Sequence, residues 1–239
     1  MKDGTPFDWN NPTHVANMYY DASNKETRDP RLYKNVLTNG SIWQKQKVEI
    51  FEGGKNKILD GSTKTGYYLR KYMNPSVSLD PDKPNKLYHH YVLFRYAEIL
   101  LNYAEAMNEW KGPDATAEGC PLTARAALNQ VRDCADMKHV TENGADFTAK
   151  VRNERRIELA FEGHRFYDIR RWGIYEEEEG KPIEGMNIDG LENEFFQRTV
   201  VNHADYRNRV VDKKTVFLPI PRNEVRKAPK LDQNPGWDD

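Results

Sequence analysis

One stretch constrains the fold more than any other, VRNERRIELAFEGHRFYDIRRW, which runs from Val151 to Trp172. It carries more charge than a surface helix needs and more aromatic residues than a loop usually holds. Strong helix formers fill its first part, Asp146 can cap the start, and Gly163 can end or bend the helix. We therefore expect a helix from about Asp146 to Glu162, a break at Gly163 and a second short helix to Trp172.

Two carboxylates of this helix, Glu154 and Glu158, share a face with its apolar residues. Steps of three and four place them on one stripe with Phe147, Val151, Phe161 and Arg165. A buried carboxylate needs a cationic partner, because burying it alone is prohibitive. Arginines close by in sequence can supply bidentate donors: Arg152, Arg155, Arg156, Arg165, Arg170 and Arg171.

We interpret Glu154 and Glu158 as members of a structural ion-pair lattice. The alternative is a pair of catalytic carboxylates, as in glycoside hydrolysis. Nearby arginines would keep both carboxylates ionised, which opposes the raised pKa that a general acid requires. The sequence therefore predicts no catalytic residues here.

Composition limits the classes of protein that need to be considered. The 239 residues suffice for one large or two small domains, with 31% charged residues, 13 Tyr and 5 Trp. A mean hydropathy of -0.90 indicates a loop-rich chain with a polar surface, in which aromatic residues provide packing or ligand contacts. The net charge of -1 comes from interspersed basic and acidic residues, so we expect no nucleic-acid partner.

Sequence features argue against membrane spans, metals and nucleotides. No apolar run approaches the roughly 20 residues that cross a bilayer, and the N-terminus lacks the apolar region of a signal peptide, so the protein is either cytoplasmic or a trimmed chain. His89 and His90 are neighbours that would point to opposite faces of an extended segment, so we predict no metal site. GSTKTG at Gly61–Gly66 lacks the spacing of a phosphate loop, and no cofactor is expected.

The two cysteines, Cys120 and Cys134, flank a predicted helix. A helix from Pro121 to Ala135 would separate them by ~21 Å at about 1.5 Å per residue, far beyond disulfide reach. We expect two free thiols.

The clearest helix covers Leu93 to Trp110, where polar residues occupy one narrow stripe and apolar residues the rest. A second helix is predicted from Leu122 to Ala135. Together they form an antiparallel hairpin with alanines at the contact, similar to a tetratricopeptide unit with a lengthened turn.

The first 60 residues show little periodicity. Asn11 and Pro12 indicate a short helix to about Tyr20, and Gly53-Gly54 could turn a strand at Lys47–Phe51 back towards Ile58. Residues 66–73 are expected to form a short strand rich in tyrosine. Aromatic residues in this polar region either fill local cores or serve as platforms for a ligand such as a sugar ring: Trp9, Tyr19, Tyr20 and Trp43.

The last part of the chain gives weaker signals. Residues 176–179 form a solvated acidic run, and residues 180–209 are expected to be irregular. Residues 216–220 are apolar and extended, and Pro221 begins a short helix. Trp237 is available to dock.

Several segments together resemble the C-terminal half of the SusD/RagB family, in the same order along the chain. They are DPRL at Asp29–Leu32, TGYYLRKYM, RYAEILLNYAEAMNE, LNQVRDCADM, VRNERRIELAFEGHRFYDIRRWG, LPIPRNEV and LDQNPGW. The resemblance implies a surface lipoprotein of the Bacteroidetes outer membrane, built on tetratricopeptide-type helices. Such proteins cap a SusC-like TonB-dependent transporter and capture oligosaccharides or other nutrients.

Two features of that family are missing from this sequence, namely the lipidated cysteine and the N-terminal half. We therefore expect a fragment or one chain of a divided protein, whose helix at Leu93–Trp110 buries part of its surface against the missing half. The predicted fold is mainly α, with tetratricopeptide-like helical hairpins, long irregular loops and a few short strands. Residues 1–90 would form a loop-rich candidate ligand-binding segment, and residues 91–239 the helical SusD-like region.

The resemblance also favours one function. It implies oligosaccharide binding at the cell surface, without catalysis, for delivery to the transporter, with the lipid anchor outside this chain. It strengthens the interpretation of Trp9, Tyr19, Tyr20 and Trp43 as a sugar platform, because sugar C–H faces stack on aromatic rings. The alternatives are a glycan-processing enzyme with paired carboxylates and a helical-repeat adaptor that binds only protein partners.

Overall fold

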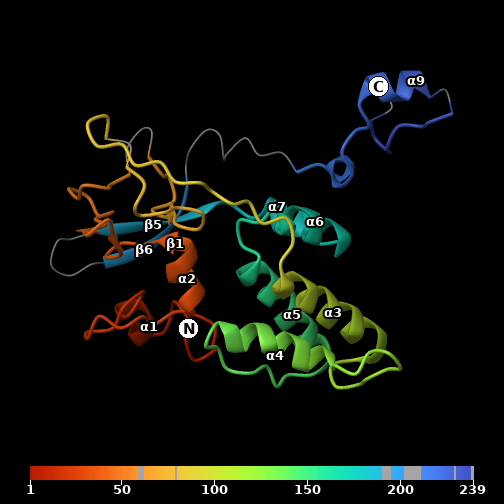
Figure 1. Ribbon diagram of the computed structural model, residues 1–239, viewed down its shortest axis with the longest axis horizontal. Coiled ribbons are helices and arrows are strands. Elements are labelled where there is room, and N and C mark those ends of the chain that lie inside the picture. The colour runs from red at the N-terminus through yellow and green to blue at the C-terminus, as the bar shows by residue number, and fades with distance from the viewer. Residues whose placement is uncertain (59–61, 79, 190–194, 202–210, 229, 238–239) are drawn as a thin grey trace.

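The computed structural model describes residues 1–58, 62–78, 80–189, 195–201, 211–228 and 230–237. A bundle is formed by the three helices α3 (Tyr96–Lys111), α4 (Ala124–Cys134) and α5 (Gly144–Glu158). A loop-rich N-terminal region lies beside this bundle, and the helices α6 (His164–Arg171) and α7 (Tyr175–Gly180) follow α5 (Figure 1). Among the described residues, no helix combines the length and the apolar character that a membrane span requires.

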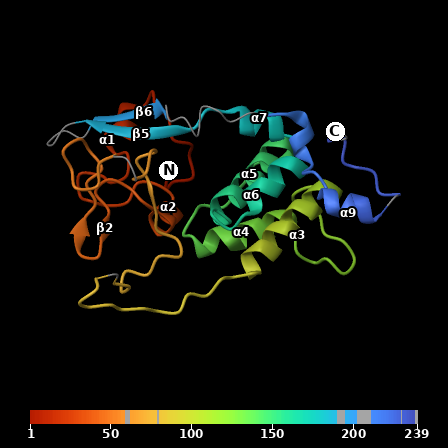
Figure 2. The ribbon, with the colours of Figure 1, turned by 90° about the horizontal axis from the view of Figure 1, so that it is seen from above.

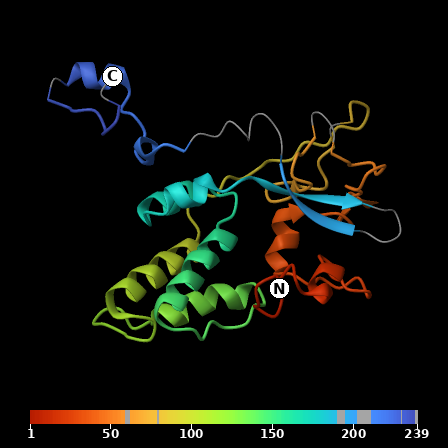
Figure 3. The same cartoon turned by 180° about the vertical axis from the view of Figure 1, so that it is seen from behind.

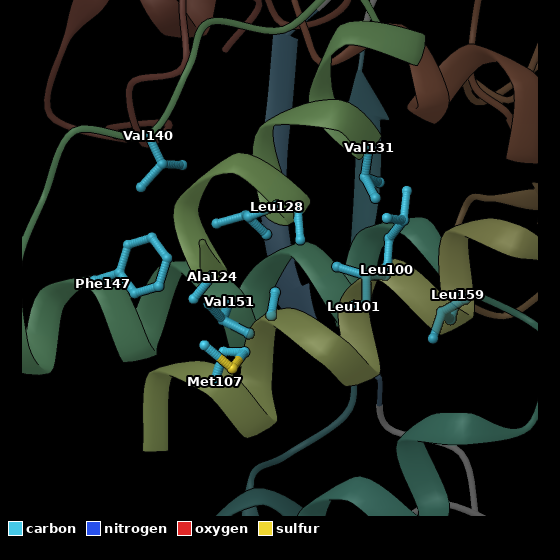
Figure 4. Packing of buried hydrophobic residues seen from close by; sticks show 12 residues of the cluster. Leu100, Leu101, Met107, Ala124, Leu128, Val131, Val140, Phe147, Val151 and Leu159 are labelled. Carbon is cyan, nitrogen blue, oxygen red and sulfur yellow. The ribbon is translucent and has the colours of Figure 1, made fainter. Parts of the chain in front are cut away.

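The bundle encloses an apolar core contributed by all three helices (Figure 4). Its buried members are Leu100, Leu101, Ala104, Met107, Ala124, Ala127, Leu128, Val131, Val140, Phe147, Val151 and Leu159. The predicted hairpin of two helices is confirmed, with α3 packed on α4. Helix α3 starts three residues later than predicted, because Arg95 has extended backbone and its guanidinium is bound by Glu158 and Glu162. Cys120 and Cys134 are free, as predicted.

Helix α5 is shorter at its C-terminal end than the sequence suggested. It starts at Gly144 and stops at Glu158. The expected cap at Asp146 is wrong, because Asn143 holds the N-cap position and Asp146 lies in the first turn. Cations replace the missing helical donors, because Lys71 Nζ donates to Ala160 O at 2.8 Å and Arg95 Nη2 to Glu158 O at 2.6 Å. The predicted break at Gly163 is confirmed, since this residue has φ +85° directly before α6.

Two short helices organise the N-terminal region. Helix α1 (Pro12–Ala16) is capped by Asn11, whose side chain accepts from the backbone N–H groups of Thr13 and His14, but it ends before Tyr20. Helix α2 (Pro30–Asn35) is capped in the same way by Asp29. Proline at the first helical position supports both, because its missing N–H would be unpaired there anyway.

The short strands of this region differ from the predicted ones. Strand β1 (Val36–Leu37) pairs with β4 (Tyr68–Leu69), so only two residues of the expected strand at residues 66–73 are paired. Strand β2 (Ile42–Trp43) pairs with β3 (Gln46–Lys47). The expected hairpin between Lys47–Phe51 and Ile58 is wrong. Gln44 and Lys45 both have positive φ, which makes a tight turn that returns Lys47 to Ile42 instead.

A long hairpin occupies the segment that was expected to be irregular. Strands β5 (Glu184–Asp189) and β6 (Phe195–Val200) are antiparallel, in a register that pairs Glu184 with Val200. This hairpin lies against the N-terminal region, as Figures 2 and 3 show from above and from behind. Its apolar side chains join a second core made of Met18, Tyr19, Tyr33, Val48, Ile50, Met186 and Ile188. The prediction failed because the core residues against which β5 packs lie far away in sequence.

The C-terminal part holds a short 3-10 helix η1 (Lys213–Val216) and helix α9 (Arg222–Lys227), which follows Pro221 as predicted. Trp237 docks on this part, since its indole N–H donates to the carbonyls of Lys214 and Phe217 at 3.1 and 3.0 Å. The division of the chain at residue 90 stays a prediction.

Candidate ligand-binding groove

The two carboxylates considered for catalysis are held by guanidinium groups. Glu154 is 1% exposed, and its two oxygens lie 2.5 Å from Arg31 Nη1 and 2.5 Å from Arg132 Nη1. Glu158 contacts Arg31 at 2.9 Å and Arg95 at 2.6 Å. This geometry is that of a structural ion-pair lattice, because each carboxylate oxygen of Glu154 and Glu158 already has a cationic donor.

The cationic partners differ from those expected from the sequence. Arg31 belongs to α2, Arg132 to α4, and Arg95 precedes α3, so they come from three separate elements. Of the arginines close in sequence, Arg155 binds Asp168 instead, and Arg171 binds Asp168 and Glu105. The helical stripe faces the neighbouring elements, and those elements supply the charges that reach it.

Glu162 extends the lattice to the loop after α5. It accepts from Arg95 and from Lys71, whose Nζ lies 2.6 Å away. Burial raises the pKa of Glu162, but the hydrogen bonds from Arg95 and Lys71 outweigh it and hold this pKa below its ordinary value. Glu162 is thus kept ionised, which suits a structural ion pair and opposes use as a general acid.

A different feature offers room for a ligand. An open groove of about 1020 Å³ lies between the loop at residues 16–24, the turn at residues 39–47 and strand β6. Its lining comprises Ala16, Asn17, Met18, Tyr19, Tyr20, Asp21, Ala22, Asn24, Asn39, Gly40, Ile42, Lys47 and Phe196. Aromatic, amide and charged groups therefore meet in one concave surface, as ligand sites generally require.

Local hydrogen bonds fix both loops that form the groove. Asp21 Oδ1 accepts from the backbone N–H groups of Ser23 and Lys25 at 2.8 and 3.0 Å, which closes a tight turn. On the other side, Gly40 N donates to Val48 O at 2.9 Å, at the base of the β2–β3 hairpin. Hydrogen bonds within the chain therefore hold both walls in place although they lie in loops.

Two of the four predicted aromatic residues line this groove, Tyr19 and Tyr20. Tyr19 is buried, its ring meets Phe196 edge-on at 5.4 Å, and its hydroxyl donates to Tyr67 at 2.8 Å. Burial raises the pKa of Tyr19, so the phenol stays protonated. Tyr20 is half-buried and rests against Tyr33 with 5.4 Å between ring centroids. Tyr20 is thus the more accessible ring of the two.

The other two predicted residues, Trp9 and Trp43, are half-buried outside the groove lining. Trp9 meets Phe7 edge-on at 5.1 Å and lies under the guanidinium of Arg198 at 5.5 Å. Trp43 packs against the second core from strand β2. The structure therefore brings Tyr19 and Tyr20 together but leaves both tryptophans elsewhere.

Of the groove residues, the sequence interpretation named only Tyr19 and Tyr20, and those that it missed include Asn39, Lys47 and Phe196. Phe196 lies in the segment taken as irregular, where alternation over residues 195–200 was too weak to reveal a strand. Asn39 and Lys47 carry no motif, and only the chain path places them beside Tyr20. Within the described ranges, no three His, Cys, Asp or Glu side chains gather in a way that could hold a metal ion.

Comparisons with known proteins agree with this architecture. A SusD-like protein of Bacteroides fragilis is 29% identical, with a TM-score of 0.72 over 99% of this chain and 45% of its own. A SusD-like carbohydrate-binding protein of the same species is 29% identical, with a TM-score of 0.69 over 97% of this chain and 46% of its own. These likenesses confirm the predicted fold class of tetratricopeptide-like helices with few short strands.

A curated relative points in the same direction. A SusD-like protein of Formosa agariphila is 30% identical over 173 residues, which are 67% of this chain and 27% of the relative. The chain thus spans about a quarter of that relative and less than half of the two solved structures. The family model described as the SusD family matches residues 1–237. The chain belongs to the SusD family.

Proposed function

We propose that this protein binds oligosaccharide at the cell surface and delivers it to a SusC-like TonB-dependent outer-membrane transporter, with its lipid anchor outside this chain. The observation that carries the proposal is the groove between Tyr20, Asn39 and Phe196, on a chain of the SusD family. One solved relative is a SusD-like carbohydrate-binding protein, which supports the same ligand class.

The groove has the chemistry that sugar binding requires. The ring of Tyr20 offers a face for sugar C–H groups, while Asn17, Asn24 and Asn39 place amides around it for hydroxyl groups. The lattice carboxylates give no support to a glycan-processing enzyme, since Glu154 and Glu158 are both bound by arginines. We therefore propose binding without turnover, with Tyr19 and Tyr20 in the site and Trp9 and Trp43 as further candidates.

Replacing Tyr20 by Ala should weaken oligosaccharide binding several-fold, because one stacked ring is worth about 1 kcal/mol beyond the area it buries. Isothermal titration against an oligosaccharide panel, followed by product analysis, measures both binding and turnover. Tyr88→Ala is the matched control, since Tyr88 is 99% exposed and lies outside the groove. Unchanged affinity in Tyr20→Ala and in the alanine variants of the other three candidates would contradict the proposed site. Turnover would instead indicate an enzyme. The absence of both binding and turnover would indicate an adaptor.

The partner proposal concerns the part of the SusD-family fold that this chain does not match. Solved relatives are more than twice as long as the matched portion. A long apolar surface is exposed here at Leu87, Tyr88, Tyr91, Val92, Leu93, Phe94, Tyr96 and Ile99. Figure 2 shows the chain before α3 running along the outside of the molecule. Soluble monomers seldom expose a contiguous surface of this kind, so we propose that the N-terminal half of the same protein covers it.

Produced by itself, the chain should bind a dye specific for exposed apolar surface and should self-associate in sedimentation experiments. Replacing Phe94 and Ile99 together by Ser should reduce both effects, because these side chains are 78% and 52% exposed. Leu218→Ser is the control, since Leu218 is similarly exposed but lies in the C-terminal part. Equal dye binding in the double variant and the parent would show that this surface is not the one left uncovered.

A further inference from the structure

Asn39 carries a buried hydrogen-bond donor that is unused within the described part of the chain. The side chain is 2% exposed, and its Oδ1 accepts from Ile50 N at 2.8 Å, which fixes the orientation of the amide. Its Nδ2 has no acceptor among the described residues. A buried unpaired donor costs stability, so native structures rarely keep one without a reason. Because Asn39 lines the groove, a ligand is the natural source of the missing acceptor.

Lys47 supplies a second donor from the same turn, residues 39–47. The stem of Lys47 runs against Gly40, where Lys47 Cε would be 3.8 Å from an added Cβ and the Tyr20 ring 3.7 Å from the same position. Lys47 is exposed and forms no ion pair within the part of the chain that the structure describes. Lys47 and the Tyr20 ring therefore meet beside Gly40, the residue that follows Asn39 in the chain, and all three side chains belong to residues that line the groove.

The other charged residue that lines the groove does not pair with Lys47. Asp21 is the only carboxylate among the described lining residues, and its Oδ1 accepts from the backbone N–H groups of Ser23 and Lys25. Asp21 thus closes its own loop and forms no ion pair with Lys47 among the described residues. The turn at residues 39–47 consequently offers the Asn39 amide donor and the positive charge of Lys47, and neither has an acceptor among the described residues.

We propose that the groove selects an acidic sugar, whose carboxylate is bound by the Asn39 amide and the Lys47 ammonium while its ring rests on Tyr20. This inference rests on the proposed oligosaccharide binding and adds the class of sugar. The Asn39 Nδ2 group and the Lys47 ammonium can only donate hydrogen bonds. A carboxylate suits them because it only accepts, whereas a hydroxyl group also donates. Hydrogen bonds between ionised partners are also stronger than neutral ones.

Matched ligands test the charge directly. Uronic-acid oligosaccharides and their carboxyl-reduced neutral counterparts are titrated calorimetrically into the intact chain. In each pair that binds, the acidic sugar should bind at least about tenfold more tightly than its neutral counterpart. Hydrogen bonds to charged groups are stronger than neutral ones by a free energy of that size. Added salt should reduce this preference, because it screens exposed charges.

Variants of this chain test the two donors. Lys47→Gln should remove most of the preference for the acidic sugar, and Asn39→Asp should abolish it, since a second carboxylate would face the ligand. Lys45→Gln is the control for the first, because Lys45 is exposed in the adjacent turn but does not line the groove. Asn129→Asp is the control for the second, because Asn129 Oδ1 likewise accepts a backbone N–H, that of Val140, at 2.8 Å in the helical core.

The possible results separate this inference from the proposed function. Equal affinity for acidic and neutral sugars would overturn the acidic-sugar inference and leave oligosaccharide binding intact. An acidic preference that Lys47→Gln leaves unchanged would overturn it as well, and this exposed substitution does not depend on the folding of Asn39→Asp. No binding of any sugar by the parent chain would overturn both proposals.

Discussion

Replacing Glu154 by Gln should lower the free energy of unfolding by about 3–5 kcal/mol, one of the two largest effects expected of a single substitution in this protein. Glu154 lies between Arg31 and Arg132, and the three side chains are 1%, 10% and 10% exposed. Glutamine keeps the shape of the side chain but removes its charge. Arg132 would then lose the carboxylate with which it pairs, whereas Arg31 would keep Asp29 and Glu158. The buried charge of Arg132, left uncompensated, is what makes the change costly.

Chemical denaturation of parent and variant measures this difference. Glu142→Gln is the matched control, because Glu142 pairs with Lys150 at 3.0 Å at side-chain exposures of 36% and 33%. Exposed pairs of this kind contribute only about 0–1 kcal/mol, so the control should stay close to the parent. A Glu154→Gln protein as stable as the parent would refute the structural role, most clearly if it lost a catalytic activity.

Gly66→Ala should destabilise the protein by about 3 kcal/mol or more, through strain and overlap together. Gly66 has φ +75°, a conformation that alanine adopts only at a cost, and an added Cβ would lie 2.4 Å from the carbonyl oxygen of Met186. Nearby, Met186 N donates to Thr65 O at 2.8 Å, so the backbone of β5 packs directly on this turn. The overlap would push the β5–β6 hairpin away, and with it Phe196 from the groove.

Gly53→Ala separates the two contributions. Gly53 has φ +90°, but nothing lies within 4 Å of an added Cβ, so only the strain of about 1–2 kcal/mol remains. Denaturation curves of both variants should therefore differ by the cost of the overlap alone. If both variants lost the same stability, the close approach of Gly66 to Met186 would not exist in solution.

The sequence by itself determined the helical part of this protein. The periodicity of apolar residues predicted α3 and α4, and Asn11 was correctly predicted to cap α1. These signals are readable because a helix is specified by residues three and four apart and by its own caps. The structural role of Glu154 also followed from sequence, since a carboxylate on an apolar stripe needs cations wherever they come from.

Only the tertiary structure decided which groups meet. Arg31 reaches Glu154 across 123 residues, and no local pattern could have chosen it over the arginines of α5 itself. The β5–β6 hairpin was missed because its apolar residues find their partners in the first 70 residues. The groove has the same origin, since Tyr20, Asn39, Lys47 and Phe196 come from separate segments. Such contacts are fixed by the close packing of segments that are distant in sequence. The periodicity of one segment does not indicate which other segments will pack against it.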